Sequence, residues 1–472
     1  MNRNTQIIRR RFFSERIPKY QKDPVLFAKE VLQFEPDDWQ KEALLDLAEN
    51  PKVAIKSGQG VGKTGIEAVA LLWFLTCFPY PRVVATAPTK QQLHDVLWSE
   101  VAKWQERSPL LKAILKWTKT YIYMIGNEKR WFATARTATK PENMQGFHEE
   151  NMLFIIDEAS GVADPIMEAI LGTLSGTNNK LLMCGNPTRT SGTFYDAFHA
   201  VRWMYKCHTV SSEDSPRTNK ENIRALIERF GYDSNVVRVR VRGLFPKQDA
   251  DTFIALQLLE QAVNIEIERE EEYIPIRIDI GCDVARFGED NTVIAKKIDE
   301  EIPELLVRQG QDTMKTAGDI IRIYRDLLEQ YPKYNDYIYV KIDDTGVGGG
   351  VSDRLNELKS DPNEGLDKML IVPVNFARKS PKKAKSARHY DDIVTWMWAL
   401  VRDLLTNNEL KLPNDAVLLG EFSCRKYTFV SNGKQRLESK DSLKERGLSS
   451  PDRADAVALA CMPIHLKKEG RR

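Results

Sequence analysis

A short glycine-rich segment ends in a lysine and a threonine, a combination that suits phosphate binding. Its candidate contact residues are Ser57, Gly58, Gln59, Gly60, Val61, Gly62, Lys63 and Thr64. Backbone amides in such a loop wrap the phosphates of a nucleotide such as ATP, and the following helix adds the positive end of its dipole. We expect Lys63 to reach the β- and γ-phosphates and Thr64 to bind Mg²⁺. Ser57 replaces the usual first glycine, but the predicted strand 53–55 and the apolar helix 66–74 disfavour a turn without a ligand.

Two acids follow an apolar run further along the chain. Residues 153–156 predict a buried central strand, which would bring Asp157 to the water shell of the Mg²⁺. Glu158 stands one residue further on, where it can polarise the attacking water as a general base. Such a run is a weak signal alone, but together with the glycine-rich loop it indicates ATP hydrolysis.

Three further side chains are candidates for the same site, and each has an alternative that the sequence leaves open. Asn186 follows the predicted strand 180–184 and is a candidate sensor of the γ-phosphate, although an Asn-Pro turn explains it nearly as well. Gln40 is a candidate reader of the adenine edge, or a helix-capping residue. Arg136 is a candidate arginine finger acting in cis, although a surface arginine is the commoner explanation.

A second set of acids lies in the C-terminal half of the chain. Asp283 ends the predicted strand 274–282, Asp343 follows the strand 337–342, and Asp455 lies on an apolar helix with Asp452 one turn earlier. Mg²⁺ and Mn²⁺ prefer oxygen ligands, and a two-metal site needs carboxylates from several elements. The set therefore predicts a metal site, and the glycines after Asp343 would let a phosphate backbone approach.

The neighbouring acids leave the ligand set open. Asp290 is best explained as a turn residue before the next strand, and Asp344 as a turn cap. Asp452 also suits the N-terminus of a helix, where the dipole favours an acid. Asp455 is hardest to explain structurally, because an unpaired charge on an apolar helix is costly to bury.

A basic track, residues 378–388, holds six cationic residues and no acid. This composition suits contact with a phosphate backbone, which needs charge rather than base readout, and a solvated loop is the alternative. The track precedes the predicted helix 393–404, in which Trp396, Trp398 and Leu400 indicate core packing rather than base stacking.

The elements that must position these residues form two series. Apolar runs alternate with helical stretches between residues 52 and 187, with strands predicted at 53–55, 83–87, 153–156 and 181–184. This pattern is typical of a parallel sheet covered by helices, in which ligands sit at the carboxyl ends of the strands. A second series contains predicted strands at 274–280, 292–298 and 337–342.

Between the two series, residues 266–272 carry acids at five of seven positions, which indicates a solvated linker or helix face. We predict a first domain at 1–245, a linker at 246–272, a second domain at 273–463 and a basic tail at 464–472.

Composition excludes several classes of protein. The 472 residues exceed one ordinary core, and no segment reaches the roughly 20 apolar residues of a membrane span, so we expect no membrane partner. The six cysteines are scattered without a CxxC pair, which disfavours a zinc site and fits a reducing cytosol. A net charge of +2 excludes a globally basic nucleic-acid binder and leaves room for a local track.

Taken together, the motifs resemble those of the large terminase subunits of tailed bacteriophages and prophages. The resemblance spans residues 39–459 and rests on the P-loop, Leu-Phe-Ile-Ile-Asp-Glu-Ala (153–159), Gly-Asn-Pro (185–187), Gly-Cys-Asp-Val-Ala-Arg-Phe-Gly-Glu-Asp (281–290), Asp-Asp-Thr-Gly-Val-Gly-Gly-Gly-Val (343–351) and Ser-Pro-Asp-Arg-Ala-Asp-Ala (450–456). It implies a P-loop ATPase domain, with a parallel sheet covered by helices, followed by an RNase H-like mixed α/β nuclease domain.

The resemblance also implies activity and partners. The family translocates double-stranded DNA into an empty procapsid at the expense of ATP and cuts concatemeric DNA by a metal-dependent endonuclease. It implies ATP and Mg²⁺ as cofactors, with Mn²⁺ as an alternative at the nuclease site. The implied partners are double-stranded DNA, the portal protein, the small terminase subunit and further copies in a ring on the portal, in the cytoplasm of the bacterial host; a monomer in isolation is the open alternative.

By resemblance, Lys63, Asp157 and Glu158 match the ATPase residues, and Asp283, Asp343 and Asp455 match the nuclease carboxylates. Many relatives carry an Arg-Gly pair where this chain has Gln145-Gly146, which leaves the arginine finger open. The rival interpretation, an ATP-dependent DNA translocase or helicase without nuclease activity, explains the first set of residues but not the three carboxylates.

Overall fold

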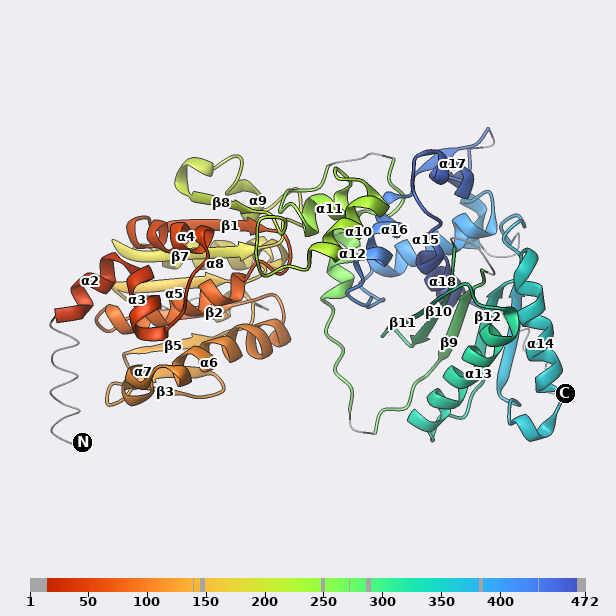
Figure 1. Cartoon of the computed structure of the whole chain (residues 1–472), viewed down its shortest axis with the longest axis horizontal. Helices are drawn as coiled ribbons and strands as arrows, with labels where there is room; N and C mark the ends of the chain where they lie inside the picture. Colours follow the sequence, from red (N-terminus) through yellow and green to blue (C-terminus); the bar gives the residue numbers. More distant parts are fainter. Residues whose placement is uncertain are drawn as a thin grey trace. The chain divides into compact units, whose positions relative to one another are not determined.

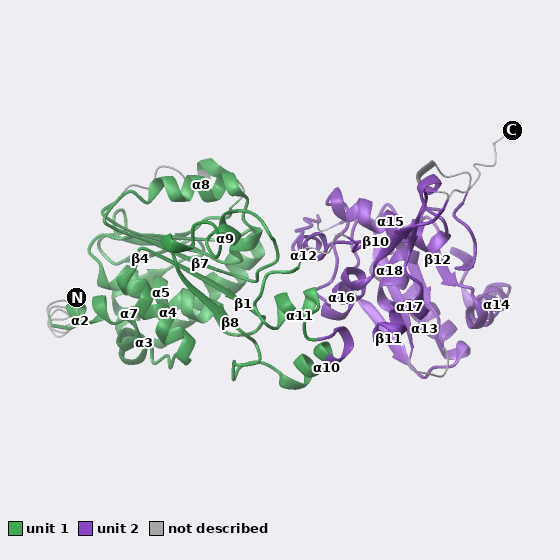
Figure 2. Cartoon of the chain, turned by 90° about the horizontal axis from the view of Figure 1, so that it is seen from above, with its two compact units in different colours: residues 1–227, 232–248 green, residues 228–231, 249–472 purple. Residues whose placement is uncertain are grey.

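The structure is a computed structural model, and it describes residues 15–138, 140–144, 149–247, 251–270, 272–285, 290–381, 385–431 and 433–464. The chain divides into two compact units (Figure 2). Unit 1 takes residues 1–227 and 232–248, and unit 2 takes residues 228–231 and 249–472. The boundaries of the functional domains predicted above remain a prediction.

Unit 1 is built on one eight-stranded sheet, labelled in Figure 1. Its order is β3-β4-β5-β2-β6-β7-β1-β8, and the six strands from β5 to β8 are parallel. The strand bounds are β1 (Lys52–Ser57), β2 (Arg82–Thr86), β3 (Leu115–Trp117), β4 (Tyr121–Met124), β5 (Phe132–Ala135), β6 (Asn151–Ile156), β7 (Asn178–Gly185) and β8 (Lys206–Val210). The predicted parallel sheet is confirmed; the antiparallel pair β3 and β4 was not predicted.

Unit 1 contains ten α-helices within the described residues, of which α5 and α8 pack on opposite faces of the sheet, while the last residues of α10 belong to unit 2. Their bounds are α2 (Ile17–Lys22), α3 (Pro24–Leu32), α4 (Asp38–Glu49), α5 (Lys63–Cys77), α6 (Ser99–Arg107), α7 (Pro109–Ile114), α8 (Asp164–Thr173), α9 (Thr193–Asp196), α10 (Lys220–Phe230) and α11 (Asn235–Arg240). Val53 and Ile55 of β1 join the core around α5, while Ala54 joins the core under α8. Because both faces are buried, the strands read as apolar runs rather than alternating patterns.

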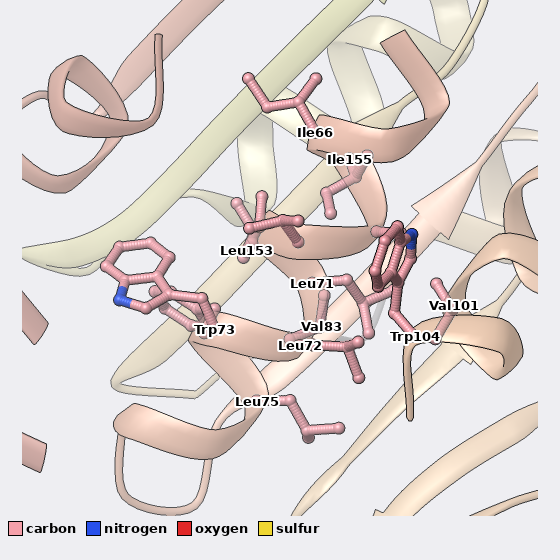
Figure 3. Packing of buried hydrophobic residues seen from close by; sticks show 14 of the residues in the cluster. Ile66, Leu71, Leu72, Trp73, Leu75, Val83, Val101, Trp104, Leu153 and Ile155 are labelled. Carbon is pink, nitrogen blue, oxygen red and sulfur yellow. The ribbon is translucent and has the colours of Figure 1, made fainter. Parts of the chain in front are cut away.

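The helix α5 is the centre of the larger core. It is buried at every position from Ile66 to Cys77, so it is apolar all round rather than amphipathic. Figure 3 shows part of this packing, with Leu71, Leu72 and Leu75 beside side chains of β2 and β6. This burial fixes the N-terminus of α5, and with it Lys63, against the carboxyl ends of the strands.

Unit 2 contains a five-stranded mixed sheet of order β11-β10-β9-β12-β13. Strand β10 is antiparallel to β9 and β11, whereas β9, β12 and β13 are parallel. The bounds are β9 (Ile278–Asp283), β10 (Asn291–Ile298), β11 (Leu305–Gln309), β12 (Ile338–Asp343) and β13 (Met369–Val374). Three antiparallel strands followed by two parallel ones, with helices packed on them, form the mixed α/β arrangement that was predicted for this part of the chain.

The helices of unit 2 include α12 (Leu256–Val263), α13 (Thr313–Gln330), α14 (Gly349–Lys359), α15 (Ile393–Thr406), α16 (Ala416–Cys424), α17 (Lys440–Glu445) and α18 (Asp452–Cys461). Ile278, Ile280 and Cys282 of β9 pack under α13 and α14. Since strand side chains alternate, Gly281 and Asp283 face the opposite side, where α18 lies.

The start of β9 differs from the prediction. The sequence predicts a strand from residue 274, but β9 begins at Ile278. Pro275 has no N–H to donate, and the N–H groups of Ile276 and Arg277 donate to the carboxylate of Asp299 instead of to a neighbouring strand. In this segment the Asp299 carboxylate therefore accepts the hydrogen bonds that a neighbouring strand would otherwise accept.

No helix within the described ranges is long and apolar enough to cross a membrane.

Candidate functional site

The glycine-rich loop connects β1 to α5 in unit 1. Gly60 and Gly62 adopt positive φ values of 74° and 93°, which favour glycine, and Gly62 caps α5. A β-carbon at Gly58 would overlap the carbonyl oxygen of Val241. These positions therefore require glycine, and the loop presents the N-terminus of α5 as an anion site.

Three predicted residues converge at the carboxyl edge of the sheet. The Lys63 Nζ donates to Asn186 Oδ1 at 3.0 Å and lies 3.6 Å from Glu158 Oε1. The amide of Asn186 in turn donates to the Ser57 carbonyl at 2.7 Å, and its backbone N–H reaches Glu158 Oε2 at 3.4 Å. Asn186 therefore links the glycine-rich loop to the acidic pair, which is more than a turn residue needs to do.

The acidic pair follows β6. Burial, together with the charge of Glu158, raises the pKa of Asp157 to about 7. Glu158 occupies the left-handed region at φ 46°, a conformation that costs a non-glycine residue about 1–2 kcal/mol. Strain of this kind is typical of functional positions, where the surrounding structure holds a side chain in a required direction.

A residue that the sequence reasoning missed lies beneath this pair. Glu67, one helical turn after Lys63, is fully buried. Burial, together with the charge of Asp157, raises the pKa of the Glu67 carboxyl well above its usual range. Burial alone would lower the pKa of Lys63, but the charges of Glu158 and Asp157 outweigh it and raise that pKa. The site thus holds one lysine among three acids.

Gln40 and Arg136, the two remaining candidates for this site, have different surroundings. Gln40 is fully buried; its Oε1 accepts from the Asp37 N–H at 2.9 Å and its Nε2 donates to the Gly62 carbonyl at 2.9 Å. The capping interpretation of Gln40 is confirmed, because it closes a capping box at the start of α4. Arg136 is exposed and follows β5. Three strands, β2, β6 and β7, lie between β5 and the strand β1 that leads into the glycine-rich loop. The role of Arg136 as an arginine finger stays a prediction.

In unit 2, Asp283 and Asp343 end the adjacent parallel strands β9 and β12. Gly281 lets α18 approach β9 closely, because a β-carbon there would overlap the Ala456 carbonyl. The close approach brings Asp455 of α18 toward the strand end that carries Asp283. The three predicted carboxylates therefore lie on the same face of the sheet, and Asp283 and Asp455 share the Lys440 ammonium as a partner.

Asp455 is held by buried donors. The Trp398 indole donates to Asp455 Oδ1 at 2.8 Å, and the Arg425 guanidinium donates to the same oxygen at 3.4 Å. Burial alone would raise the pKa of Asp455, but the charges of Lys440 and Arg425 hold it below the usual range. Trp398 is buried, as predicted, yet it also orients a site carboxylate, which the sequence reasoning missed.

Lys440 bridges two of the carboxylates. Its Nζ lies 3.0 Å from Asp455 Oδ2 and 3.5 Å from Asp283 Oδ2. Both oxygens are buried and face this ammonium group, so the position between them suits a cation. Burial alone would lower the pKa of Lys440, but the charges of Asp455 and Asp283 raise it.

The remaining acids have other partners. Burial raises the pKa of Asp283 well above its usual range, and Asp343 accepts from the Thr345 N–H at 2.9 Å. Asp452 accepts from the Asn291 N–H at 2.7 Å, and Asp290 lies 3.8 Å from Lys444. In the part of the chain that the structure describes, no three His, Cys, Asp or Glu side chains are gathered closely enough to hold a metal ion. The full ligand set therefore stays a prediction.

Part of the basic track can be followed. Lys379 pairs with Asp391 at 2.9 Å, whereas Lys382, Lys383 and Ala384 lie outside the described residues. The Gln145-Gly146 pair and the tail from residue 465 also lie outside them.

Comparison with known proteins gives one curated relative and several solved structures. No protein-family model matches the sequence. The chain is 24% identical over 471 residues to the probable terminase, large subunit, of Enterobacteria phage P7, covering 94% of this chain and 91% of that protein. The large terminase of a thermophilic bacteriophage is 11% identical over 90% of this chain and 98% of its own, with a TM-score of 0.43. The large terminase of bacteriophage HK97 is 15% identical over 93% of this chain and 99% of its own, with a TM-score of 0.39.

Proposed function

We propose that the chain is a large terminase subunit of a phage, that it couples ATP hydrolysis to the packaging of double-stranded DNA, and that it cuts that DNA at a second site. The observation that carries the proposal is the presence of two separate charged sites in one chain. Lys63, Glu158 and Asn186 meet at one sheet edge in unit 1, and Asp283, Asp455 and Lys440 meet in unit 2.

At the first site we assign ATP hydrolysis to unit 1. The loop amides and Lys63 hold the phosphates, while Thr64 and Asp157 hold Mg²⁺, which neutralises phosphate charge when bound. Glu158 accepts a proton from the attacking water. Asn186, bonded to both Lys63 and the loop, changes partners when the γ-phosphate is lost and so reports hydrolysis.

At the second site we assign phosphodiester cleavage to unit 2. Asp283, Asp343 and Asp455 hold the cation, with Asp452 as a further candidate ligand. When bound there, Mg²⁺ or Mn²⁺ would supply the charge needed to activate water and to stabilise the leaving 3′ oxygen. Trp398 and Arg425 fix Asp455 Oδ1, which leaves its Oδ2 directed toward Asp283 and Lys440.

We propose ATP as the fuel, Mg²⁺ as the resident ion, and double-stranded DNA as the substrate. We also propose the portal protein and the small terminase subunit as partners, a ring of copies on the portal, and the cytoplasm of the bacterial host as the location. The domain limits proposed are 1–245 for the ATPase and 273–463 for the nuclease.

A translocase or helicase without nuclease activity is the second candidate. It is favoured by Lys440, whose ammonium already lies against two of the carboxylates. It does not explain why three carboxylates, those of Asp283, Asp343 and Asp455, are all buried on the same face of the sheet.

Plasmid cleavage and ATP hydrolysis measured in parallel separate the candidates. The full chain is assayed with Mg²⁺ or Mn²⁺, alongside Asp283→Ala and Lys63→Ala. We expect Asp283→Ala to lose cutting and keep ATP hydrolysis, and Lys63→Ala to lose ATP hydrolysis. If the unaltered protein hydrolyses ATP but never cuts with either metal, the nuclease assignment is wrong and the translocase is the better account.

A further inference from the structure

Residues 211–220 form a loop that lies directly on the glycine-rich loop. The Ser212 hydroxyl donates to the Gln59 carbonyl at 2.7 Å, and a β-carbon at Gly60 would lie 3.4 Å from the Thr218 methyl group. These contacts link two segments that are more than 150 residues apart in the sequence.

The loop is held in one shape by a single ammonium group. Lys220 Nζ donates to the carbonyls of Ser212, Glu213 and Ser215 at 3.0, 2.7 and 2.6 Å. It also donates to the Thr218 hydroxyl at 3.0 Å. Since the loop is ordered by these bonds, the side chain of Arg217 starts from a fixed backbone position.

Arg217 lies over the N-cap of α5. A β-carbon at Gly62 would lie 3.1 Å from Arg217 Cδ and 3.1 Å from Gln40 Nε2. The guanidinium nitrogen Nε would lie 3.3 Å from the same β-carbon, so it is next to the residue that caps the anion site at the N-terminus of α5.

Its present partner is a carboxylate. Arg217 Nε and Nη2 donate to the two oxygens of Asp37 at 2.7 and 3.2 Å, a bidentate pair. The Arg217 side chain is 41% exposed and that of Asp37 is 18% exposed. An ion pair this exposed adds little stability, so exchanging its acceptor costs little. The guanidinium fork fits phosphate oxygens as well as carboxylate oxygens.

We propose that Arg217 is a nucleotide-binding residue that binds the polyphosphate, and that Asp37 holds it aside until nucleotide arrives. The inference rests on the proposed ATPase function and adds a residue to that site. It also assigns Asp37 an opposing role, because the carboxylate and the phosphates compete for one guanidinium.

If Asp37 and the phosphates compete for Arg217, then removing Asp37 should tighten nucleotide binding and removing Arg217 should weaken it. A purely structural ion pair would instead give the same effect when either partner is removed. Asn is as good a helix N-cap as Asp, so Asp37→Asn removes the charge and keeps the start of α4 intact. Equilibrium binding of ADP and of a non-hydrolysable ATP analogue to the full chain is measured for Arg217→Ala, Arg217→Lys and Asp37→Asn. Arg16→Ala is the matched control, because Arg16 forms a half-exposed pair with Glu30 at 3.1 Å in the same unit.

We expect Arg217→Ala to weaken ADP binding about tenfold, a loss typical of one charge-assisted hydrogen bond, and Arg217→Lys to weaken it less. Asp37→Asn is expected to tighten ADP binding a few-fold, while adenosine binding and the Arg16→Ala variant stay unchanged. Thermal unfolding of each variant shows that it is folded.

Equal weakening by Arg217→Ala and Asp37→Asn would mean a structural clamp and would overturn the inference. If Arg217→Ala weakened the binding of adenosine and of ADP equally, Arg217 would contact the nucleoside rather than the phosphates, and the inference would be wrong. If the unaltered protein binds nucleotide and Arg217→Ala binds it equally well, only this inference is wrong. Failure of the unaltered protein to bind any nucleotide overturns both the inference and the proposed function.

Discussion

The two charged sites are positioned by different parts of the chain. In unit 1, the phosphate-binding groups come from one continuous loop whose backbone conformation depends on Gly58, Gly60 and Gly62, whereas Glu158 and Asn186 come from other elements. In unit 2, Asp283, Asp455 and Lys440 come from three elements and are brought together by packing of α18 on β9. The phosphate-binding loop of the first site is therefore local, whereas the whole of the second site exists only in the folded unit.

The lysine of each site, Lys63 in unit 1 and Lys440 in unit 2, faces acids of different exposure. Lys63 faces an amide and Glu158, whose side chain is 30% exposed, so a ligand can take over its contacts. Lys440 faces two acids that are 7% and 0% exposed. Lys63 therefore faces a partly exposed acid whose place a ligand can take, whereas Lys440 balances two buried acids.

The largest effect is expected from Glu158→Gln. The amide keeps the shape of the side chain but cannot accept a proton, so ATP hydrolysis should fall by about 10²–10⁴-fold. DNA cutting and ADP binding should stay close to those of the unaltered protein. Steady-state phosphate release and plasmid cleavage measure both activities; a parallel loss of cutting would show that the sites are not separate.

A matched pair of glycine substitutions tests the comparison directly. Gly58→Ala and Gly281→Ala each place a methyl group against a backbone carbonyl, that of Val241 and of Ala456 respectively. Such overpacking costs about 1–3 kcal/mol. If that cost falls on the active geometry, Gly58→Ala should lower ATP hydrolysis at least about tenfold and leave cutting unchanged. Gly281→Ala should lower cutting at least about tenfold and leave ATP hydrolysis unchanged. The opposite pairing of losses would contradict the assignment of the two sites.

Trp398→Phe tests whether packing also sets the chemistry of the second site. The ring still packs on Phe422, 4.9 Å between centroids, but the indole donor to Asp455 is lost. A lost hydrogen bond to a buried carboxylate should lower the free energy of unfolding by about 1–3 kcal/mol. The Mn²⁺ concentration for half-maximal cutting should rise, and Trp396→Phe on the same helix is the control. An unchanged metal requirement would mean that Trp398 only fills the core.

The smallest effect concerns pH. A carboxyl whose folded pKa is raised to about 7, as for Asp157, binds its proton more tightly in the folded chain than in the unfolded one. It therefore destabilises the ligand-free fold progressively from about pH 4 to pH 7, and fully above that. Asp157→Asn should raise the urea midpoint at pH 8 and change it little at pH 4. An equal shift at both pH values would exclude Asp157 as the cause.

Much of the fold was predictable because its signals are local. Residues 153–156 are buried in β6, and residues 181–184 lie in β7, since parallel strands covered on both faces must be apolar throughout. The start of β9 was predicted wrongly because the acceptor that replaces the ladder, Asp299, lies beyond the strand in the sequence. The antiparallel strands β3 and β4, at one side of the sheet, are too short to give a clear alternating pattern.

The sequence by itself determined the glycine-rich loop, the acidic pair and the ends of β9 and β12, because each is a contiguous pattern dictated by backbone geometry. Only the tertiary structure decided that Lys440, Trp398 and Arg425 meet Asp455, and that Arg217 lies over Gly62. Lysine, arginine and tryptophan occur at many kinds of position in folded proteins, so the residue type does not predict where in the fold such a side chain lies. Their roles follow from which buried charge the packing sets beside them, and a buried carboxylate must find its partner wherever the fold supplies one.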